Sequence, residues 1–287
     1  MLRNQVRCQL PFMSYSGQWL RVRPHECSIC MNREKGLYMR VLVSGLYGFM
    51  GREVARLLQK GTEGGELAGG VSLNPDGTFD VPCAETFADA ITDVDVVVDF
   101  SHHSLTQDLL SYAVNNNIPL VLATTGQTDE EKQMITAASQ KIPLFFAANY
   151  SLGVALLIDL AKRTAAVMSG AEIEIIERHH NRKLDAPSGT ALAIAHAIQE
   201  VRPESNIVTG RSGYGKRDAN DIGIHAVRMG NIVGIHEVVV GTDNQSITLK
   251  HEAYSRALFA EGALKAAAFL IRQPAGLYDM NSLLKEN

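Results

Sequence analysis

A glycine triplet that directly follows a short apolar strand constrains the fold of this chain more than any other feature. Residues 40–44 are mostly apolar and β-branched, and they lead straight into Gly-Leu-Tyr-Gly-Phe-Met-Gly at residues 45–51. A helical pattern with one apolar face follows over residues 50–58. Strand, glycine turn and helix in this order favour a dinucleotide site over an ordinary turn, because the turn lets the phosphates approach the helix N-terminus.

The same alternation of strands and helices continues to residue 148. It predicts a Rossmann-like, doubly wound α/β domain with a parallel sheet over residues 39–148. Ligands in such a sheet bind outside the carboxyl ends of the strands, so the loops at these ends are expected to form one crevice. His102 and His103 lie in one of these loops, either near the cofactor or simply exposed. The further expected strands cover residues 66–72, 93–100, 119–123 and 143–148, and the expected helices cover 105–115 and 129–140.

The pattern changes after residue 149 and predicts an α+β second domain with a mixed sheet over residues 149–255. A glycine-rich, charged loop is expected at 210–222. The last helix, at 256–271, and the tail to residue 287 are expected to pack back onto the first domain. The remaining expected helices cover 152–168 and 189–201, and the remaining strands cover 171–178, 224–229, 235–241 and 246–251.

Composition excludes several classes of protein. The net charge of −4 gives no overall attraction to nucleic acid or to an anionic membrane. No apolar run reaches the roughly 20 residues that span a bilayer. Four cysteines in 287 residues do not suggest a disulfide framework, so a reducing, cytoplasmic location is expected.

Residues 1–38 form an N-terminal extension without a clear pattern, and we expect them to be disordered. Cys27 and Cys30, with His25 nearby, have the spacing of metal ligands. A second pair of ligands is missing, so no metal site is expected. Met39 stands directly before the first strand and is a candidate for the natural start.

The stretch from Glu177 to Thr190 carries the highest density of chemical groups in the chain. Successive side chains of a strand point to opposite faces. Only one of His179 and His180 is therefore expected near the reaction, unless the strand ends there. Lys183 lies in the following loop, from which its side chain is able to swing over the same site.

A helix start follows this loop and is suited to binding an anion. Ser188 is a candidate N-cap, and the free amides near Gly189 and Thr190 are able to hold a carboxylate. Arg178 and Arg182 make the neighbourhood cationic. Each residue alone fits a solvated turn, whereas the whole group favours an active site.

The same stretch resembles the signature of a known enzyme family. It reads Glu-Arg-His-His-Asn-Arg-Lys-Leu-Asp-Ala-Pro-Ser-Gly-Thr, which fills every fixed position of the pattern E-x-H-H-x-x-K-x-D-A-P-S-G-T of the 4-hydroxy-tetrahydrodipicolinate reductases. Further agreement occurs at residues 45–51, 124–126, 146–153 and 227–236. The resemblance covers the chain from Met39 to its C-terminus.

The resemblance implies reduction of a cyclic, imine-containing dicarboxylate by NADH or NADPH, in the diaminopimelate route to lysine. It implies that His179 is the general acid/base, that Lys183 donates a proton, and that His180, Gly189 and Thr190 bind the substrate. It also implies a homotetramer built through the second domain. The residues implied to line the cofactor site are Gly45, Leu46, Tyr47, Gly48, Phe49, Met50, Ala123, Thr124, Thr125, Ala147, Ala148, Asn149 and Tyr150.

Two departures from the family pattern concern the cofactor. Ser72 stands where many relatives have the acidic residue that binds the adenosine ribose, and neither Leu73 nor Asn74 replaces it. The choice between NADH and NADPH therefore stays open. Ala123 replaces a glycine and adds a methyl group close to the expected nicotinamide position.

Two other functions fit parts of the pattern. A two-domain dehydrogenase that acts on an amino acid or hydroxy acid would share the same cofactor site. A nucleotide-sensing protein without catalytic activity would bind NAD(P)H but have no use for Lys183.

Overall fold

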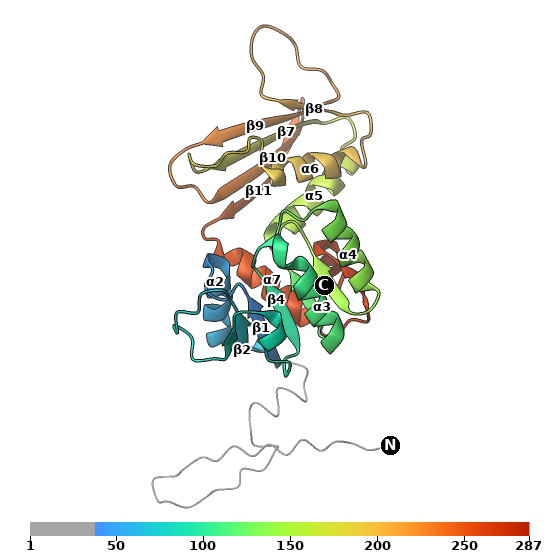
Figure 1. The fold of residues 1–287 in the computed structure, drawn as a ribbon. Coiled ribbons are helices and arrows are strands. Elements are labelled where there is room, and N and C mark those ends of the chain that lie inside the picture. The colour runs from blue at the N-terminus through green and yellow to red at the C-terminus, as the bar shows by residue number, and fades with distance from the viewer. Residues whose placement is uncertain (1–37, 287) are drawn as a thin grey trace, which may run out of the picture.

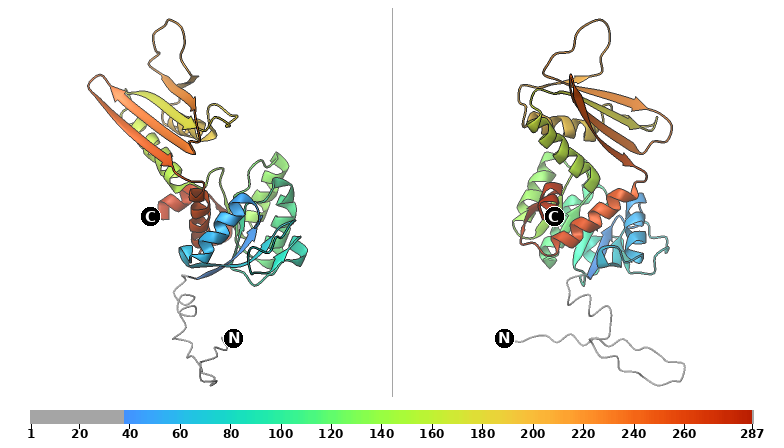
Figure 2. Two further views of the ribbon diagram at one scale, coloured as in Figure 1. Left: turned by 90° about the vertical axis from the view of Figure 1, so that its left-hand side faces the viewer. Right: turned by 180° about the vertical axis from the view of Figure 1, so that it is seen from behind.

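The computed structural model describes residues 38–286, which form two β-sheets flanked by helices (Figure 1). The expectations for residues 1–37, including the Cys27 and Cys30 pair, lie outside the described residues. The two sheets lie at opposite ends of the described part of the molecule, and two further views show the same arrangement (Figure 2). No helix between residues 38 and 286 is long and apolar enough to cross a membrane.

The first sheet has seven strands, and each pair of neighbours in it is parallel. Its order is β12-β6-β5-β4-β1-β2-β3, so β1 lies between β4 and β2, where the strand order reverses as in a doubly wound sheet. The strands are β1 (Met39–Ser44), β2 (Gly65–Val71), β3 (Cys83–Ala84), β4 (Val96–Asp99), β5 (Leu120–Leu122), β6 (Pro143–Phe146) and β12 (Gly276–Tyr278).

Helices cover both faces of this sheet, because its central strands are apolar on both sides. In β1, Val41 and Val43 belong to one hydrophobic cluster and Leu42 belongs to another. Helices α2 (Phe49–Gln59), α7 (Ala257–Leu270) and α8 (Met280–Glu286) contribute to the first cluster, whereas α3 (Thr106–Asn116) and α4 (Asp129–Ser139) contribute to the second. The predicted doubly wound α/β fold is therefore confirmed.

The second sheet has five strands in the order β11-β10-β7-β9-β8 and is mixed, as predicted. Helices α5 (Leu152–Val167) and α6 (Gly189–Gln199) pack on one of its faces against Ile173 and Ile175. The loop between β8 and β9 projects away from the first sheet (Figure 1). The strands are β7 (Glu172–His179), β8 (Asn206–Thr209), β9 (Asp221–Arg228), β10 (Gly234–Thr242) and β11 (Gln245–Ala253).

The structure differs from the predicted elements mainly at sheet edges. Three short strands, β3, β8 and β12, were not expected, and each lies at an edge of its sheet. Strand β4 begins at Val96 instead of residue 93. The reason is that Asp93 and Asp95 use their carboxylates to bind Arg40, through its guanidinium and its backbone N–H respectively.

Candidate active site

The glycine turn between β1 and α2 leaves the start of the helix open. Gly45 has φ +77°, a conformation that favours glycine, and a Cβ on Gly51 would lie 2.1 Å from the carbonyl oxygen of Gly45. The N-cap residue, Gly48, provides no side-chain hydrogen bond to the first amides of α2. These amides and the positive end of the helix therefore fit a pyrophosphate.

A cavity of about 590 Å³ lies beside this turn, at the carboxyl ends of the parallel strands. Most of the residues expected at the cofactor do line it. Ser101, in the expected crevice loop that also carries His102 and His103, lines it as well. Phe100 and Phe259 line it too, although no sequence pattern indicated them. The lining residues that were expected are Phe49, Met50, Ala123, Thr124, Thr125, Ala148, Asn149 and Tyr150.

The other expected cofactor residues lie outside the cavity lining. Leu46 is fully buried in the hydrophobic core, so only its backbone faces the turn. Tyr47 packs against the ring of Phe79. Gly45, Gly48 and Ala147 are likewise absent from the cavity wall, although the two glycines shape the turn beside it.

Asp99 forms hydrogen bonds to two of the loops that surround the cavity. Its buried carboxylate accepts hydrogen bonds from the hydroxyl groups of Ser101, at 2.5 Å, and Thr124, at 2.6 Å. Ser101 follows β4 and Thr124 follows β5, so one side chain holds two strand ends in register. Burial raises the pKa of Asp99 above its ordinary value, despite these hydrogen bonds.

The two loop histidines differ in position. His102 lines the cavity, and its Nδ1 lies 3.0 Å from the hydroxyl oxygen of Ser104. His103 turns toward α4, where its Nδ1 lies 3.1 Å from Glu131. His102 is therefore both near the cavity and exposed, whereas His103 is half-buried and does not line the cavity.

An ion pair lies beyond the end of β2. Arg52, in the first turn of α2, binds the carboxylate of Asp76 and donates to the carbonyl oxygen of Tyr47 at 3.0 Å. Hydrogen bonds from Thr78 and Arg52 lower the pKa of Asp76 to about 2. Asp76 lies two positions beyond Asn74, the last residue at which the family pattern predicts an acidic ribose-binding side chain, so the sequence pattern did not indicate it.

Strand β7 ends at His179, so the alternation of side chains along the strand does not extend to His180. His179 is 8% exposed, and its Nδ1 lies 2.5 Å from Oε2 of Glu177. Glu177 is fully buried and also accepts hydrogen bonds from both terminal nitrogens of Arg228 and from the backbone N–H of Ser188. Burial opposes the ionisation of Glu177, but the hydrogen bonds outweigh it and lower its pKa to about 2.

Ser188 is the N-cap of α6, as predicted, and its hydroxyl accepts from the backbone N–H of Ala191 at 3.2 Å. Gly189 and Thr190 are the first residues of this helix. The Ser188 hydroxyl also lies 3.0 Å from Nε2 of His236. Burial, and then the nearby His179, lower the pKa of His236 to about 4, so this ring is neutral at physiological pH.

His180 and Lys183 lie in the loop between β7 and α6. The backbone N–H of His180 donates to Ile232, whereas its buried Nδ1 has no hydrogen-bond partner within residues 38–286. Partial burial, followed by the charge of Arg182, lowers the pKa of His180. The ammonium of Lys183 lies 2.8 Å from the exposed carboxylate of Asp185.

One hydrogen bond joins the cofactor cavity to the start of α6. The side-chain amide of Asn149, which lines the cavity, donates to the hydroxyl of Thr190 at 3.2 Å. The structure therefore brings together the two stretches that the sequence singled out, which are a hundred residues and more apart. Glu177, Arg228 and His236 complete the site. Glu177 belongs to the stretch 177–190, and the other two belong to residues 227–236, where the sequence also agrees with the family pattern, but no role was assigned to them.

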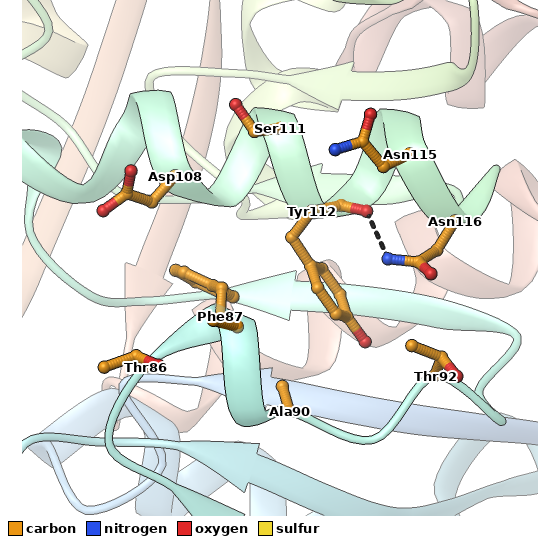
Figure 3. Close-up of a pocket in the computed structure, with 10 residues that line it drawn as sticks. Thr86, Phe87, Ala90, Thr92, Asp108, Ser111, Tyr112, Asn115 and Asn116 are labelled. Atoms are coloured by element: carbon orange, nitrogen blue, oxygen red, sulfur yellow. Dashed lines mark hydrogen bonds between the residues drawn. The ribbon is translucent and has the colours of Figure 1, made fainter.

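A second hollow, of about 490 Å³, lies between α3 and the segment that precedes β4 (Figure 3). Several of its polar side chains are bonded to nearby backbone. Tyr112 donates its hydroxyl to the carbonyl of Ile91, and Asn116 donates to the carbonyl of Tyr112 at 2.9 Å. Neither the glycine turn nor the histidine motif contributes to it, so the cavity beside the turn is the candidate site.

Within residues 38–286, no group of three or more His, Cys, Asp or Glu side chains is arranged to hold a metal ion. The ionisable groups around Glu177 form hydrogen bonds with one another.

Comparison with known proteins gives a consistent result over both sheets. Family models described as dihydrodipicolinate reductase, N-terminus, and dihydrodipicolinate reductase, C-terminus, match residues 39–150 and 153–284. A 4-hydroxy-tetrahydrodipicolinate reductase of Caldanaerobacter subterraneus subsp. tengcongensis is 46% identical over 254 residues, which are 87% of this chain and 100% of the relative. A protein of the same name from Clostridium tetani is 42% identical over 253 residues, with 86% and 98% of the two chains covered.

A solved structure has the same architecture. The dipicolinate-bound dihydrodipicolinate reductase from Paenisporosarcina sp. TG-14 has a TM-score of 0.72 and 28% sequence identity to this chain. The match covers 85% of this chain and 99% of that one. Both the parallel and the mixed sheet fall within the matched length.

Proposed function

This chain belongs to the dihydrodipicolinate reductase family and is an NAD(P)H-dependent oxidoreductase, and from this premise we propose how its residues carry the reaction. It reduces 4-hydroxy-tetrahydrodipicolinate to tetrahydrodipicolinate in the diaminopimelate route to lysine. The hydrogen bond between Asn149 and Thr190 is the observation that supports a single site for cofactor and substrate.

The reaction replaces a hydroxyl group of the substrate by hydrogen, so it consumes a hydride and a proton and releases water. The nicotinamide cofactor supplies the hydride when it is bound. His179 supplies the proton, because its Nδ1 is occupied by Glu177 while its other nitrogen faces Gly234, which has no side chain to cover it. Lys183 is a second proton donor, released when a substrate carboxylate competes with Asp185 for its ammonium.

The start of α6 holds the carboxylates of the substrate. The amides of Gly189 and Thr190 lie at the positive end of a helix of eleven residues. His180 lies in the loop that precedes this end, and its lowered pKa favours the neutral ring, which offers one N–H to a carboxylate. Arg182 adds positive charge to the same loop.

The residues of the first domain would hold the cofactor along the crevice and toward the end of β2. Its pyrophosphate would be held at the start of α2 by Gly45, Leu46, Tyr47, Gly48, Phe49 and Met50, and the residues around Thr124 and Asn149 would hold the nicotinamide in the cavity. Beyond the end of β2, Asp76 would be able to accept from a hydroxyl of the adenosine ribose, and Arg52 would be able to bind a 2′-phosphate.

We therefore propose that the enzyme uses both NADH and NADPH. Direct titration of each cofactor by fluorescence tests this, and dissociation constants within about tenfold of each other are expected. A difference of more than about a hundredfold would contradict the proposal, because it would require one partner of the Arg52–Asp76 pair to act alone.

Consumption of NADH or NADPH in the presence of freshly generated 4-hydroxy-tetrahydrodipicolinate tests the function directly. A dehydrogenase of the rival kind would instead reduce the oxidised cofactor with an amino acid or hydroxy acid. A nucleotide sensor would bind the reduced cofactor without consuming it. Either of these results would contradict the proposed reductase activity.

The reaction described here needs no metal ion. We expect that incubation with EDTA or with 1,10-phenanthroline leaves turnover within about twofold of the untreated enzyme. Loss of turnover that added zinc restores would show that a metal takes part.

Three further properties are proposals that rest on the family and the fold. Residues 39–148, with residues 256–287 packed on them, form the dinucleotide-binding domain, and residues 149–255 form the substrate-binding and oligomerisation domain. The enzyme is a homotetramer built through the second domain, which sedimentation velocity is suited to test. It works in the cytoplasm, where fractionation of native cells should place it.

A further inference from the structure

Glu177 is buried completely, and each of its two carboxylate oxygens accepts from two donors. Oε1 accepts from the backbone N–H of Ser188 at 3.0 Å and from Arg228 at 2.7 Å. Oε2 accepts from His179 at 2.5 Å and from the other terminal nitrogen of Arg228 at 2.8 Å. A carboxylate offers about four lone-pair sites, so these four donors saturate it.

This arrangement determines where His179 carries its proton. The low pKa of Glu177, about 2, means that it is ionised at neutral pH and only accepts hydrogen bonds. The proton between the two side chains therefore belongs to Nδ1 of His179, and the neutral ring has a bare Nε2. A ring that picks up a second proton carries it on Nε2, which is the nitrogen left for the substrate.

The neighbourhood of Nε2 is consistent with this assignment. A Cβ at position 234 would lie 3.1 Å from Nε2 of His179 and 4.0 Å from the ring of His236. Glycine at this position therefore leaves the nitrogen uncovered. The ring of His236 meets that of His179 edge to face, with 5.1 Å between centroids, and limits its rotation.

Arg228 extends the same cluster to the loop that carries Lys183. Besides binding both oxygens of Glu177, its guanidinium donates to the backbone carbonyl of Asp185 at 2.6 Å. Asp185 is the residue whose side chain holds Lys183. The bond from Ser188 connects Glu177 to the start of α6 as well.

We propose that Glu177 is the positioning residue of this active site: it sets the tautomer of His179 and, through Arg228 and Ser188, fixes the lysine loop and the substrate-binding helix start. Glu177 does not touch the substrate in this role. The inference rests on the proposed function only in giving His179 and Lys183 their roles in proton transfer.

A measurement on the unmodified enzyme tests the first part. Nitrogen-15 NMR of the full chain, labelled at histidine, distinguishes the two neutral tautomers, and the signals of His179 are identified by their loss in His179→Gln. We expect the neutral ring to carry its proton on Nδ1. A neutral ring with its proton on Nε2 would overturn the proposal.

The isosteric substitution Glu177→Gln tests the connection to catalysis. In either orientation the NH₂ of the amide faces one N–H of Arg228. The orientation toward His179 is favoured, because the other one adds a second clash of N–H donors at Ser188. The amide then donates to Nδ1, so we expect the tautomer to switch to Nε2–H. Turnover should fall by about 10²–10⁴-fold, while the dissociation constant for NADPH stays within about twofold, because Glu177 does not line the cofactor cavity.

Glu174→Gln is the matched control. Glu174 lies on the same strand and likewise binds two arginines, Arg211 and Arg217, and one histidine, His225, but away from His179. It should leave both the tautomer of His179 and turnover within about twofold of wild type. An equal loss of turnover in the two variants would reduce Glu177 to a structural role and overturn the proposal.

Arg228→Gln keeps the proposal testable if Glu177→Gln does not fold. The Glu177–His179 pair remains in this variant, so the Nδ1–H tautomer should persist while turnover falls at least tenfold through the loosened lysine loop. Unchanged turnover would refute the coupling to this loop. Absence of reductase turnover in the wild type would instead refute the proposed function, whatever the tautomer of His179.

Discussion

The carboxyl group of Glu177 makes the stability of the protein depend on pH in an acidic range. Its pKa is about 2 in the folded protein against 4.5 for an ordinary glutamate, so its stabilising effect is complete above pH 4.5. The effect is lost as the pH falls through 2. The difference in unfolding free energy between wild type and Glu177→Gln should therefore shrink over this range.

Urea unfolding of both proteins at a series of pH values measures this difference. One proton taken up on unfolding corresponds to a slope of up to about 1.4 kcal/mol per pH unit. A difference that stays constant from pH 4.5 to pH 2 would show that the carboxylate is not stabilised in the folded state.

Lys183→Ala should lower turnover by about 10²–10⁴-fold, because it removes a proton donor while leaving the fold intact. The side chain contacts Asp185 in an exposed loop, so the substitution should change the free energy of unfolding only slightly. Lys132→Ala is the control, since Lys132 forms a similar pair with Asp129 on α4 and lies away from the site. Steady-state kinetics of both variants measure this effect. Unchanged turnover only in the control would support Lys183 as a proton donor, and unchanged turnover in both variants would contradict it.

At this scale, the sequence indicates which residues are reactive but not how each is held. The alternation of side chains in a strand predicts that His179 and His180 differ, but β7 ends at His179, so the loop after the strand, not the alternation, places His180. The same alternation places Glu177 beside His179, a relation that sequence reasoning could have used. Arg228 and His236 come from other strands, and only pairing of β7 with β9 and β10 brings them close.

Among the elements, the turn between β1 and α2 leaves no room for a side chain at Gly51, beside the expected phosphate site. Gly51→Ala would place a methyl group 2.1 Å from the carbonyl oxygen of Gly45 and 2.8 Å from that of Leu46. The helix must shift away from the strand, which should cost about 1–3 kcal/mol of stability. The open amides at the start of α2 would shift with it.

NADPH affinity is expected to fall at least tenfold in Gly51→Ala, measured by fluorescence titration together with thermal unfolding. Gly170→Ala serves as control, because a Cβ at position 170 has no neighbour within 4 Å. Wild-type affinity in Gly51→Ala would mean that the phosphates do not rely on this helix start.

Element prediction succeeds where a periodic apolar pattern is long and fails where pairing at an edge decides the structure. The long helices and central strands carry such patterns, and their predicted positions agree with the structure to within a few residues. Strand β3 has two residues and β12 has three, so neither contains a period to detect. Both exist because a neighbouring strand offers free backbone groups.

Across the whole molecule, the segment from Asn149 to Ser151 connects the two sheets and is held from several sides. The hydroxyl of Tyr150 donates to the carbonyls of Leu122 and Phe145, and a Cβ on Gly262 of α7 would lie 1.6 Å from the carbonyl oxygen of Tyr150. Glycine thus lets α7 touch the backbone of the connection. No local pattern predicts such a contact, because its two partners are more than a hundred residues apart.

The hydrogen bond from Asn149 to Thr190 should couple cofactor binding to substrate binding. In wild type, NADPH is expected to tighten binding of dipicolinate, used as an unreactive dicarboxylate, by roughly 5–150-fold. Thr190→Val keeps the shape of the side chain but removes the hydroxyl that accepts from Asn149. This factor should then shrink by about two- to tenfold, the equivalent of one hydrogen bond.

Isothermal titration of dipicolinate with and without NADPH measures the factor, and linkage provides an internal check. Dipicolinate must tighten NADPH binding by the same factor that NADPH tightens dipicolinate binding. Thr209→Val, at the exposed end of β8, should leave the factor unchanged. An unchanged factor in Thr190→Val would mean that the two sites communicate by another route. A weaker dicarboxylate affinity in that variant, equal with and without cofactor, would then assign Thr190 to substrate binding alone.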